Sequence, residues 1–175
     1  KNPEAEFFSE VTAFDASGYG AQRIAHVRGH RPQKQQSAKS IGRTTRCDQF
    51  AIDAIAQALQ ESKLPKVALQ SSRLFLGASS GGTLEMENDR LKCGPGGPRQ
   101  YWKYPIWSSS SRVAEHFNIG GAIATYMTAC SSAAHALGQA MLDIRYGKVT
   151  TAIAGGAESI SRMTLSGFGA LGILD

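Results

Sequence analysis

Apolar residues recur at helical spacing between residues 46 and 62, and this is the clearest pattern in the chain. The stripe consists of Phe50, Ile52, Ile55, Ala56 and Leu59. This spacing places apolar side chains on one face of an α-helix. Pro65 follows and cannot continue a helix, so the pattern predicts a helix from about Arg46 to Ser62.

Three later apolar runs have the length and content of β-strands, and helix-length segments separate them. The strands are expected at residues 72–78, 122–128 and 150–154, and the helices at 83–92, 108–117 and 131–146. The first and third strands are predicted to be buried. A serine run should cap the helix at 108–117, and Gly147 is suited to end the helix before it. Alternating strands and helices predict a mostly parallel sheet covered by helices, and therefore an α/β fold.

The first forty residues carry a weaker pattern. Phe7, Phe8 and Val11 could anchor a short element, and residues 21–27 have the apolar content of a strand. Residues 29–40 are polar and lack periodicity, so we expect an exposed loop there.

Composition and charge narrow the class of protein. Hydrophobic residues make up 42% of the 175 residues and charged residues 19%, a balance that can fill a core. We expect no membrane segment, because no apolar run is long enough to span a bilayer. The net charge of +5 permits an acidic partner, including nucleic acid. A nucleic-acid-binding face is not expected, because basic residues do not alternate with aromatic ones.

Three scattered cysteines, Cys47, Cys93 and Cys130, lack metal-ligand spacing. An odd number of unpaired thiols indicates a reducing compartment, so we expect a cytoplasmic protein. We expect neither a bound metal nor a cofactor. Cys47 and Cys93 are interpreted as inert thiols.

Cys130 stands where a predicted strand ends and a predicted helix begins, among small residues that a tight turn requires. Unpaired N–H groups and the helix dipole favour a thiolate at this position. The same N–H groups can stabilise the oxyanion that forms when a thioester is attacked. A plainer interpretation stays open, because free cysteine is often a buried and inert residue.

Two motifs resemble those of one family. The segment Thr128–Ala140, with the sequence TACSSAAHALGQA, is similar to the active-site motif of β-ketoacyl synthases, and Ala154–Glu158 (AGGAE) resembles a strand end of the same family. The pair at this separation is specific, although either motif alone would be weak. Weaker similarity extends to residues 14–18, 46–50, 76–82, 144–147 and 166–170.

The resemblance implies a thiolase-like fold, of which this chain would be one incomplete half of the αβαβα layers. It also implies a condensation reaction in fatty acid or polyketide synthesis. Cys130 would accept an acyl group from a carrier-protein thioester. A malonyl thioester would then lose carbon dioxide, and its carbanion would attack the acyl–enzyme.

Partners and pocket residues follow from the same resemblance. Acyl carrier protein is the expected partner, and the chain is expected in a homodimer or in a heterodimer of ketosynthase and chain-length factor. The strand at 122–128 would pair across the two-fold axis. Met86, Phe168 and Ala129 would bind the substrate, although Met86 and Phe168 could equally be core residues.

The chain also departs from the family. Two histidines and a lysine belong to the family's second half, and His26, His30, His116 and His135 do not stand in matching motifs. His135 lies beyond Cys130 on the same predicted helix and is interpreted as structural. The first core strand of the family is also not found before Lys1. We therefore expect residues 1–175 to be the N-terminal ketosynthase region, incomplete on its own.

Several alternatives stay open at this point. Glu158 is interpreted as a structurally paired carboxylate in preference to an acid–base catalyst. The basic residues Arg28, Arg31, Lys34 and Lys39 form either a solvated loop or a docking surface for the carrier protein. The rival functions are a non-catalytic partner subunit like a chain-length factor and a thiolase-type enzyme that uses coenzyme A. The presence of Cys130 favours the catalytic type.

Overall fold

The computed structural model describes residues 7–25, 27, 30, 44–96 and 104–174, which belong to two compact units. The hairpin unit comprises Lys1–Arg31 and Ile160–Asp175, and the sheet unit comprises Pro32–Ser159. No helix in these described ranges is both long enough and apolar enough to cross a membrane.

The centre of the sheet unit is a three-stranded parallel sheet in the order β4-β3-β5. Its strands are β3 (Arg73–Gly77), β4 (Ile123–Tyr126) and β5 (Ala152–Gly156). The helices are α2 (Arg46–Ser62), α3 (Thr83–Cys93), α4 (Ser109–Phe117) and α5 (Ser132–Arg145), with 3-10 turns η2 (Lys66–Gln70), η4 (Ile106–Ser108) and η5 (Ala129–Ser131). Long crossovers between strands return the chain to the same end of the sheet, which makes the strands parallel.

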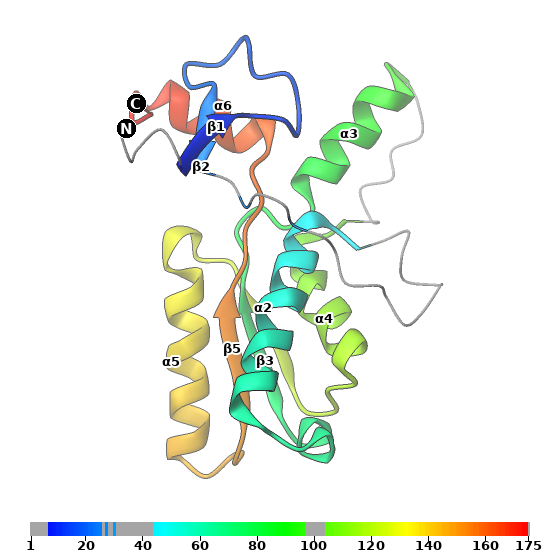
Figure 1. The fold of residues 1–175 in the computed structure, drawn as a ribbon, viewed down its shortest axis with the longest axis vertical. Helices are drawn as coiled ribbons and strands as arrows, with labels where there is room; N and C mark the ends of the chain where they lie inside the picture. Colours follow the sequence, from blue (N-terminus) through cyan, green and yellow to red (C-terminus); the bar gives the residue numbers. More distant parts are fainter. Residues whose placement is uncertain (1–6, 26, 28–29, 31–43, 97–103, 175) are drawn as a thin grey trace. The chain divides into compact units, whose positions relative to one another are not determined.

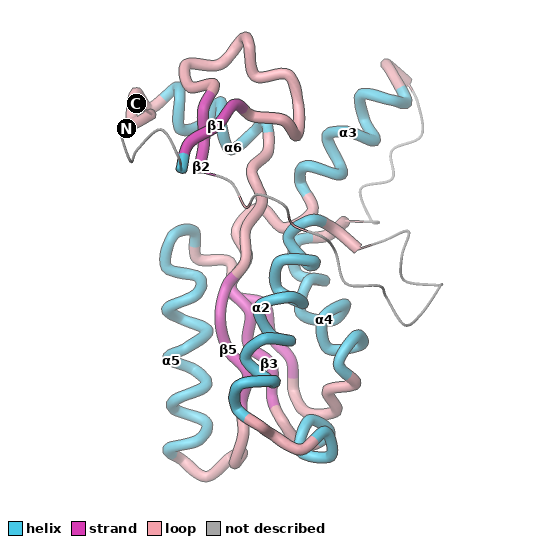
Figure 2. The backbone as a smooth tube through the Cα atoms, viewed as in Figure 1, coloured by secondary structure: helices cyan, strands magenta, loops and turns pink. Residues whose placement is uncertain are grey.

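Helices cover both faces of this sheet (Figure 1). On one face, α2 and α4 enclose Leu74 and Leu76 of β3 in an apolar core. On the other face, Ala136 and Ala140 of α5 pack against Phe75. Figure 2 shows α5 on one side of β3 and β5, with α2 and α4 on the other. Because successive strand residues point to opposite faces, three consecutive residues of β3 supply both layers.

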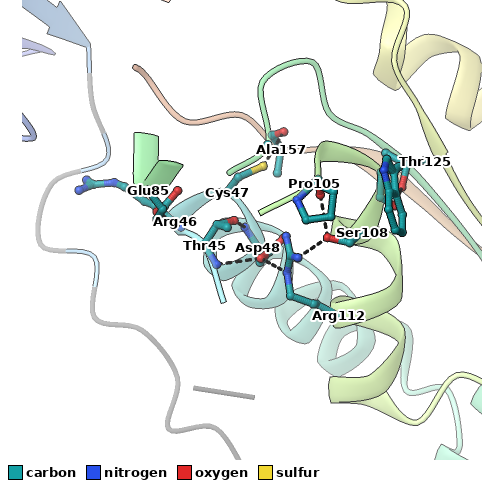
Figure 3. A network of polar contacts seen from close by, with 12 residues as sticks. Thr45, Arg46, Cys47, Asp48, Glu85, Pro105, Ser108, Arg112, Thr125 and Ala157 are labelled. Carbon is teal, nitrogen blue, oxygen red and sulfur yellow. Dashed lines mark hydrogen bonds and ion pairs between the residues drawn. The ribbon is translucent and has the colours of Figure 1, made fainter. Parts of the chain in front are cut away.

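The start of α2 is fixed by a buried ion pair (Figure 3). Thr45 caps the helix: its Oγ1 accepts a hydrogen bond from Asp48 N at 3.1 Å, and Asp48 Oδ2 accepts one from Thr45 N at 2.8 Å. Arg112 of α4 donates to the same carboxylate from Nε at 2.5 Å and from Nη2 at 3.2 Å. Asp48 has no exposed surface. Removing one partner of such a pair costs about 3–5 kcal/mol, because the other charge stays buried.

The C-terminal end of α5 is tied to β3 by Asp143. Arg73 Nη1 donates to Asp143 Oδ2 at 2.5 Å, and Gln139 Nε2 donates to Oδ1 at 2.7 Å. The hydrogen bond from Arg73 holds the pKa of Asp143 below its usual value. Gly147 then ends the helix with a φ of 67°, in the left-handed region that was predicted for this glycine.

The outer side of α5 is apolar and exposed. Leu137, Met141 and Ile144 are 55%, 59% and 46% exposed, whereas Ala136 and Ala140 on the inner side are buried. Small residues let the inner side of α5 pack against the sheet, whereas its outer side stays uncovered among the described residues.

The hairpin unit contains a two-stranded antiparallel sheet and one helix. Strands β1 (Phe8–Glu10) and β2 (Arg23–Ala25) pair with Ser9 opposite Ile24. Helix α6 (Arg162–Ala170) is capped by Ser161, whose Oγ accepts a hydrogen bond from Thr164 N at 3.1 Å. The Arg162 guanidinium lies 4.8 Å from the centre of the Phe14 ring, a cation–π contact within the unit.

The predicted α/β class and mostly parallel sheet are confirmed, and two details are wrong. The strand expected at 150–154 lies at Ala152–Gly156 and is half-buried, because β5 is at an edge of the described sheet. Within the described residues, Ser108 gives α4 no side-chain cap, since its Oγ donates to Pro105 O at 2.7 Å and contacts Arg112. Apart from His30, the expected loop at 29–40 lies outside the described residues.

Candidate active site

Cys130 lies in the turn between β4 and α5, as the sequence predicted. The turn contains η5, and Cys130 is its central residue and is exposed. In the part of the chain that the structure describes, no side chain caps the start of α5. The N–H groups of Ser131 and Ser132 donate to Thr128 O and Ala129 O, so a ligand that approaches Cys130 could be bound only by other N–H groups of this turn.

The residue before Cys130 has a left-handed backbone. Ala129 has a φ of 52°, a conformation that costs an L-residue about 1–2 kcal/mol. Its carbonyl oxygen is held by Ser132, whose Oγ donates at 2.7 Å and whose N–H also donates to it. A third donor comes from a distant segment, because Ser79 Oγ lies 2.9 Å from the same oxygen. These contacts stabilise a tight turn that sequence alone could not describe.

Further hydrogen bonds close the turn around Cys130. Thr128 N donates to Ser132 Oγ at 2.9 Å, and Ser131 Oγ donates to Thr128 O at 2.7 Å. His135 Nδ1 lies 2.8 Å from Thr128 Oγ1 and 3.0 Å from Ser131 O. The imidazole therefore braces the turn against α5, which agrees with its structural interpretation.

A pair of glycines lets α5 approach the sheet at this point. Gly77 and Gly156 are opposite each other in β3 and β5. A Cβ atom added to Gly77 would lie 2.4 Å from Ala133 N, and one added to Gly156 would lie 2.7 Å from Ala133 Cβ. Neither distance is tolerable, so the first turn of α5 rests directly on two residues without side chains.

Glu158 organises the turn that follows β3. Its Oε2 accepts hydrogen bonds from Ser79 N at 2.7 Å and Ser80 N at 3.0 Å, and its Oε1 accepts from Ser80 Oγ at 2.6 Å and Gly81 N at 3.2 Å. The structural interpretation of Glu158 is therefore confirmed. The residue as a whole is exposed. Through Ser79, the AGGAE segment and the turn at Cys130 are connected.

The two other cysteines differ from Cys130. Cys47 is 1% exposed. Its Sγ donates to Ala157 O at 3.1 Å, and Figure 3 draws this contact. Burial, with a smaller contribution from Glu158, raises the pKa of this thiol far above its usual range. Cys47 is therefore an inert thiol, as expected. Cys93 is exposed and is the last residue of α3, away from any helix start.

Comparison with known protein families identifies the family of this chain. Residues 12–175 match the family model described as "Beta-ketoacyl synthase, N-terminal domain". The chain belongs to the β-ketoacyl synthase family. The resemblance inferred from TACSS and AGGAE is thereby confirmed.

Named relatives agree with this assignment. A 3-oxoacyl-[acyl-carrier-protein] synthase 2 from Coxiella burnetii is 29% identical over 169 residues, and one from Vibrio cholerae is 28% identical over 168 residues. These alignments cover 92% and 91% of the chain, but the chain spans 41% of the length of each relative. The non-reducing polyketide synthase spyA of Aspergillus fumigatus is 48% identical over 52 residues, which cover 30% of the chain and 3% of that protein.

Solved ketosynthase structures share the fold. The ishigamide ketosynthase/chain length factor matches 96% of the chain and 44% of its own chain with a TM-score of 0.80. A β-ketoacyl synthase from Burkholderia phymatum matches 87% of the chain and 40% of its own with a TM-score of 0.72. Both are 22% identical to this chain, so they establish the fold alone. The predicted thiolase-like fold is confirmed.

The other residues predicted to bind substrate belong to both units. Met86 is half-buried on α3 of the sheet unit, Ala129 is exposed beside Cys130, and Phe168 is 40% exposed on α6 of the hairpin unit. A substrate pocket made by these three residues stays a prediction. The basic residues Arg28, Arg31, Lys34 and Lys39, together with His26, lie outside the described residues.

Two features of the site were missed. They are Ser79 and Ser132, which hold the turn at Cys130, and the serines in SSGG and TACSS were the signal that could have revealed them.

The His116 ring packs against Phe117 with the ring centres 4.7 Å apart. The described residues contain no group of three or more acidic, histidine or cysteine side chains that could hold a metal ion.

Proposed function

We propose that this chain is the nucleophile-bearing part of a β-ketoacyl synthase that condenses acyl thioesters in fatty acid or polyketide synthesis. One observation carries the proposal: Cys130 is exposed on a left-handed turn at the start of an uncapped helix. The family relationship supports it, and Cys47 cannot take this role because its thiol is buried.

The first step is transfer of an acyl group to Cys130. The thiol loses its proton, and the sulfur forms a bond to the carbonyl carbon of a carrier-protein thioester. The carbonyl electron pair moves to oxygen, where backbone N–H groups of the turn can stabilise it. The intermediate then collapses, the bond to the carrier's sulfur breaks, and the carrier leaves as a thiol after gaining a proton.

The second step is decarboxylative condensation. A malonyl thioester loses carbon dioxide, and the electron pair left behind attacks the carbonyl carbon of the acyl–enzyme. The Cys130 thiolate leaves, and a β-ketoacyl thioester is the product. Negative charge on the malonyl thioester oxygen requires a donor, and His116 and His135 make structural contacts instead. We therefore expect residues 1–175 alone to support acyl transfer at most.

The partners belong to the same proposal. Acyl carrier protein is the expected donor, and a cytoplasmic homodimer or ketosynthase/chain-length-factor heterodimer is the expected assembly. Among the described strands, β4 pairs with β3 alone, and Ile123 is 40% exposed. A strand edge of this kind is stabilised by pairing with a second chain.

A non-catalytic role like that of a chain-length factor is the second candidate. It has support from two structural matches, the ishigamide ketosynthase/chain length factor and the ketosynthase ApeO in complex with its chain length factor ApeC from Xenorhabdus doucetiae. The exposed cysteine favours the catalytic subunit. A coenzyme A thioester in place of the carrier-protein thioester stays open.

Covalent labelling tests the proposed function. The complete native protein is incubated with an acyl thioester or a cerulenin-like epoxide, and peptide mapping by mass spectrometry locates the adduct. We expect the adduct on Cys130. The exposed Cys93 is the internal control for non-specific reaction. Modification of Cys93 or Cys47 with Cys130 untouched would exclude this assignment, and an unmodified Cys130 would favour the non-catalytic role.

A further inference from the structure

The strongest unassigned feature is the hydrogen bond from Ser79 to the carbonyl of Ala129. Ser79 follows β3 and is 50 residues from Ala129 in sequence, yet its Oγ donates to that carbonyl at 2.9 Å. The other donors to this oxygen are the N–H and Oγ of Ser132, which belong to the turn itself. Ser79 is thus the described donor that comes from outside the turn.

Peptide geometry links this carbonyl to the nucleophile. The Ala129 carbonyl and the Cys130 N–H belong to one peptide group, which is planar and trans. In a trans peptide the C=O and N–H bonds point in opposite directions. A donor that fixes the Ala129 carbonyl therefore fixes the direction of the Cys130 N–H, which points away from Ser79 and Ser132.

Ser79 is itself held in place. Its backbone N–H donates to Glu158 Oε2 at 2.7 Å, and Ser80 next to it is bound to both oxygens of the same carboxylate. The fixed turn provides a rigid base from which a single hydroxyl can orient the peptide group beside Cys130.

We propose that Ser79 is a positioning residue, which aims the Cys130 N–H at the oxyanion formed when an acyl thioester is attacked. This inference rests on the proposed function. The left-handed Ala129 gives the peptide group its unusual direction, and the Ser79 hydroxyl helps the two Ser132 donors to keep it there. An N–H group stabilises an oxyanion only when it points at the oxygen. A small rotation of the peptide group therefore weakens catalysis while the sulfur stays in place.

Two reactions of the same thiol separate positioning from simple structural support. Acyl transfer develops negative charge on oxygen, whereas alkylation by iodoacetamide displaces iodide at carbon and needs no oxyanion donor. In the complete native protein, Ser79→Ala should lower kcat for acyl transfer to Cys130 about tenfold, since a misdirected oxyanion donor loses much of its effect. The KM for the acyl donor and the alkylation rate of Cys130 should stay within about twofold.

Two further variants complete the test. Ser79→Thr restores a hydroxyl and should recover most of the lost kcat. Ser71→Ala removes a similar exposed hydroxyl, which donates to Ala68 O at 3.2 Å away from the site, and should change neither reaction. Circular dichroism and thermal melting confirm that each variant folds.

The outcomes are distinct. An equal fall in acyl transfer and alkylation for Ser79→Ala would mean that the turn has collapsed, and would overturn the positioning role. Unchanged acyl transfer would overturn it as well. If Cys130 of the unaltered protein takes up no acyl group, the proposed function fails and this inference fails with it. If the unaltered protein is acylated on Cys130 and Ser79→Ala leaves kcat for acyl transfer unchanged, this inference fails but the proposed function stands.

Discussion

The starts of α2 and α5 both carry a cysteine, and they differ in almost every other respect. At α2, Thr45 and Asp48 satisfy the first N–H groups, and Cys47 is buried beneath them. At α5 the described residues provide no side-chain cap, and Cys130 is exposed. A helix start does not by itself make a cysteine reactive, because burial and neighbouring carboxylates raise the pKa of Cys47 despite its position. Reactivity requires an exposed thiol and unused N–H groups.

The most direct test of this difference between the two helix starts is to replace each cysteine. Cys130→Ser should lower acyl uptake by at least about a thousandfold, because the nucleophile is lost. Cys47→Ser should leave acyl uptake within about twofold, because the Cys47 thiol is buried away from substrate. Mass spectrometry of the acyl–enzyme measures both. Comparable losses in the two variants would show that the contrast between the helix starts is mistaken.

The buried ion pair at α2 should matter for stability and not for chemistry. Asp48→Ala removes the partner of Arg112 and the acceptor for Thr45 N, and should lower the free energy of unfolding by about 3–5 kcal/mol. Urea denaturation of the complete native protein measures the change. Cys130→Ala is the matched control at the other helix start and should shift the free energy by less than about 0.5 kcal/mol. A similar change in both variants would contradict the difference between a structural and a functional helix start.

The glycine pair beneath α5 predicts an intermediate effect. Gly77→Ala introduces a Cβ atom 2.4 Å from Ala133 N and should lower the free energy of unfolding by about 1–3 kcal/mol. Acyl uptake should fall too, because α5 must move with Cys130. Gly138→Ala is the control within α5: an added Cβ would meet no described atom within 4 Å, so stability should rise by about 0.5–1 kcal/mol. Equal effects in the two variants would refute the close approach of α5 to β3.

The smallest effect is expected from Glu85 beside the start of α2. Its Oε1 accepts a hydrogen bond from Arg46 N at 2.7 Å, while its Oε2 is buried without a partner among the described residues. Burial raises the pKa of Glu85 above its ordinary value of 4.5. The folded state therefore keeps a proton that the unfolded state has lost, and the wild-type protein loses stability as the pH rises from that value through the raised pKa.

Glu85→Gln keeps the acceptor for Arg46 N and cannot ionise. Its stability relative to the wild-type protein should therefore be greater at pH 7.5 than at pH 4.5, as measured by urea denaturation at both values. A stability difference that does not change with pH would argue against an ionisable Glu85 buried in the folded state.

Local patterns explain what the sequence could predict. The apolar stripe of α2 and the small residues around Cys130 are properties of short segments, so the helix and the turn were predicted close to their observed positions. The parallel direction of the strands could be predicted because strands and helices alternate along the chain. The family resemblance came from two short motifs, one that runs from the turn before α5 into that helix and one at the end of β5.

Contacts between distant segments explain what could not be predicted. Ser79 meets Ala129 and Glu158, residues 50 and 79 positions away, and no periodicity encodes such a meeting. The predicted strand at 150–154 stopped before Gly155 and Gly156, but both glycines belong to β5. Glycine is unfavourable in a strand interior, and Gly156 is tolerated because α5 comes too close for any side chain. The C-terminal end of β5 could therefore not be predicted without knowing how closely the first turn of α5 approaches it.

The apolar outer side of α5 has a consequence for handling the protein in solution. Uncovered leucine, methionine and isoleucine side chains in one stripe bind fluorescent hydrophobic dyes and promote colloidal association at micromolar concentrations. Preparations in which Leu137, Met141 and Ile144 stay uncovered should therefore scatter light more strongly as the salt concentration rises, since salting-out strengthens apolar contact. Dye fluorescence thus reports, without any enzymatic assay, whether this side of the helix is covered in a given sample.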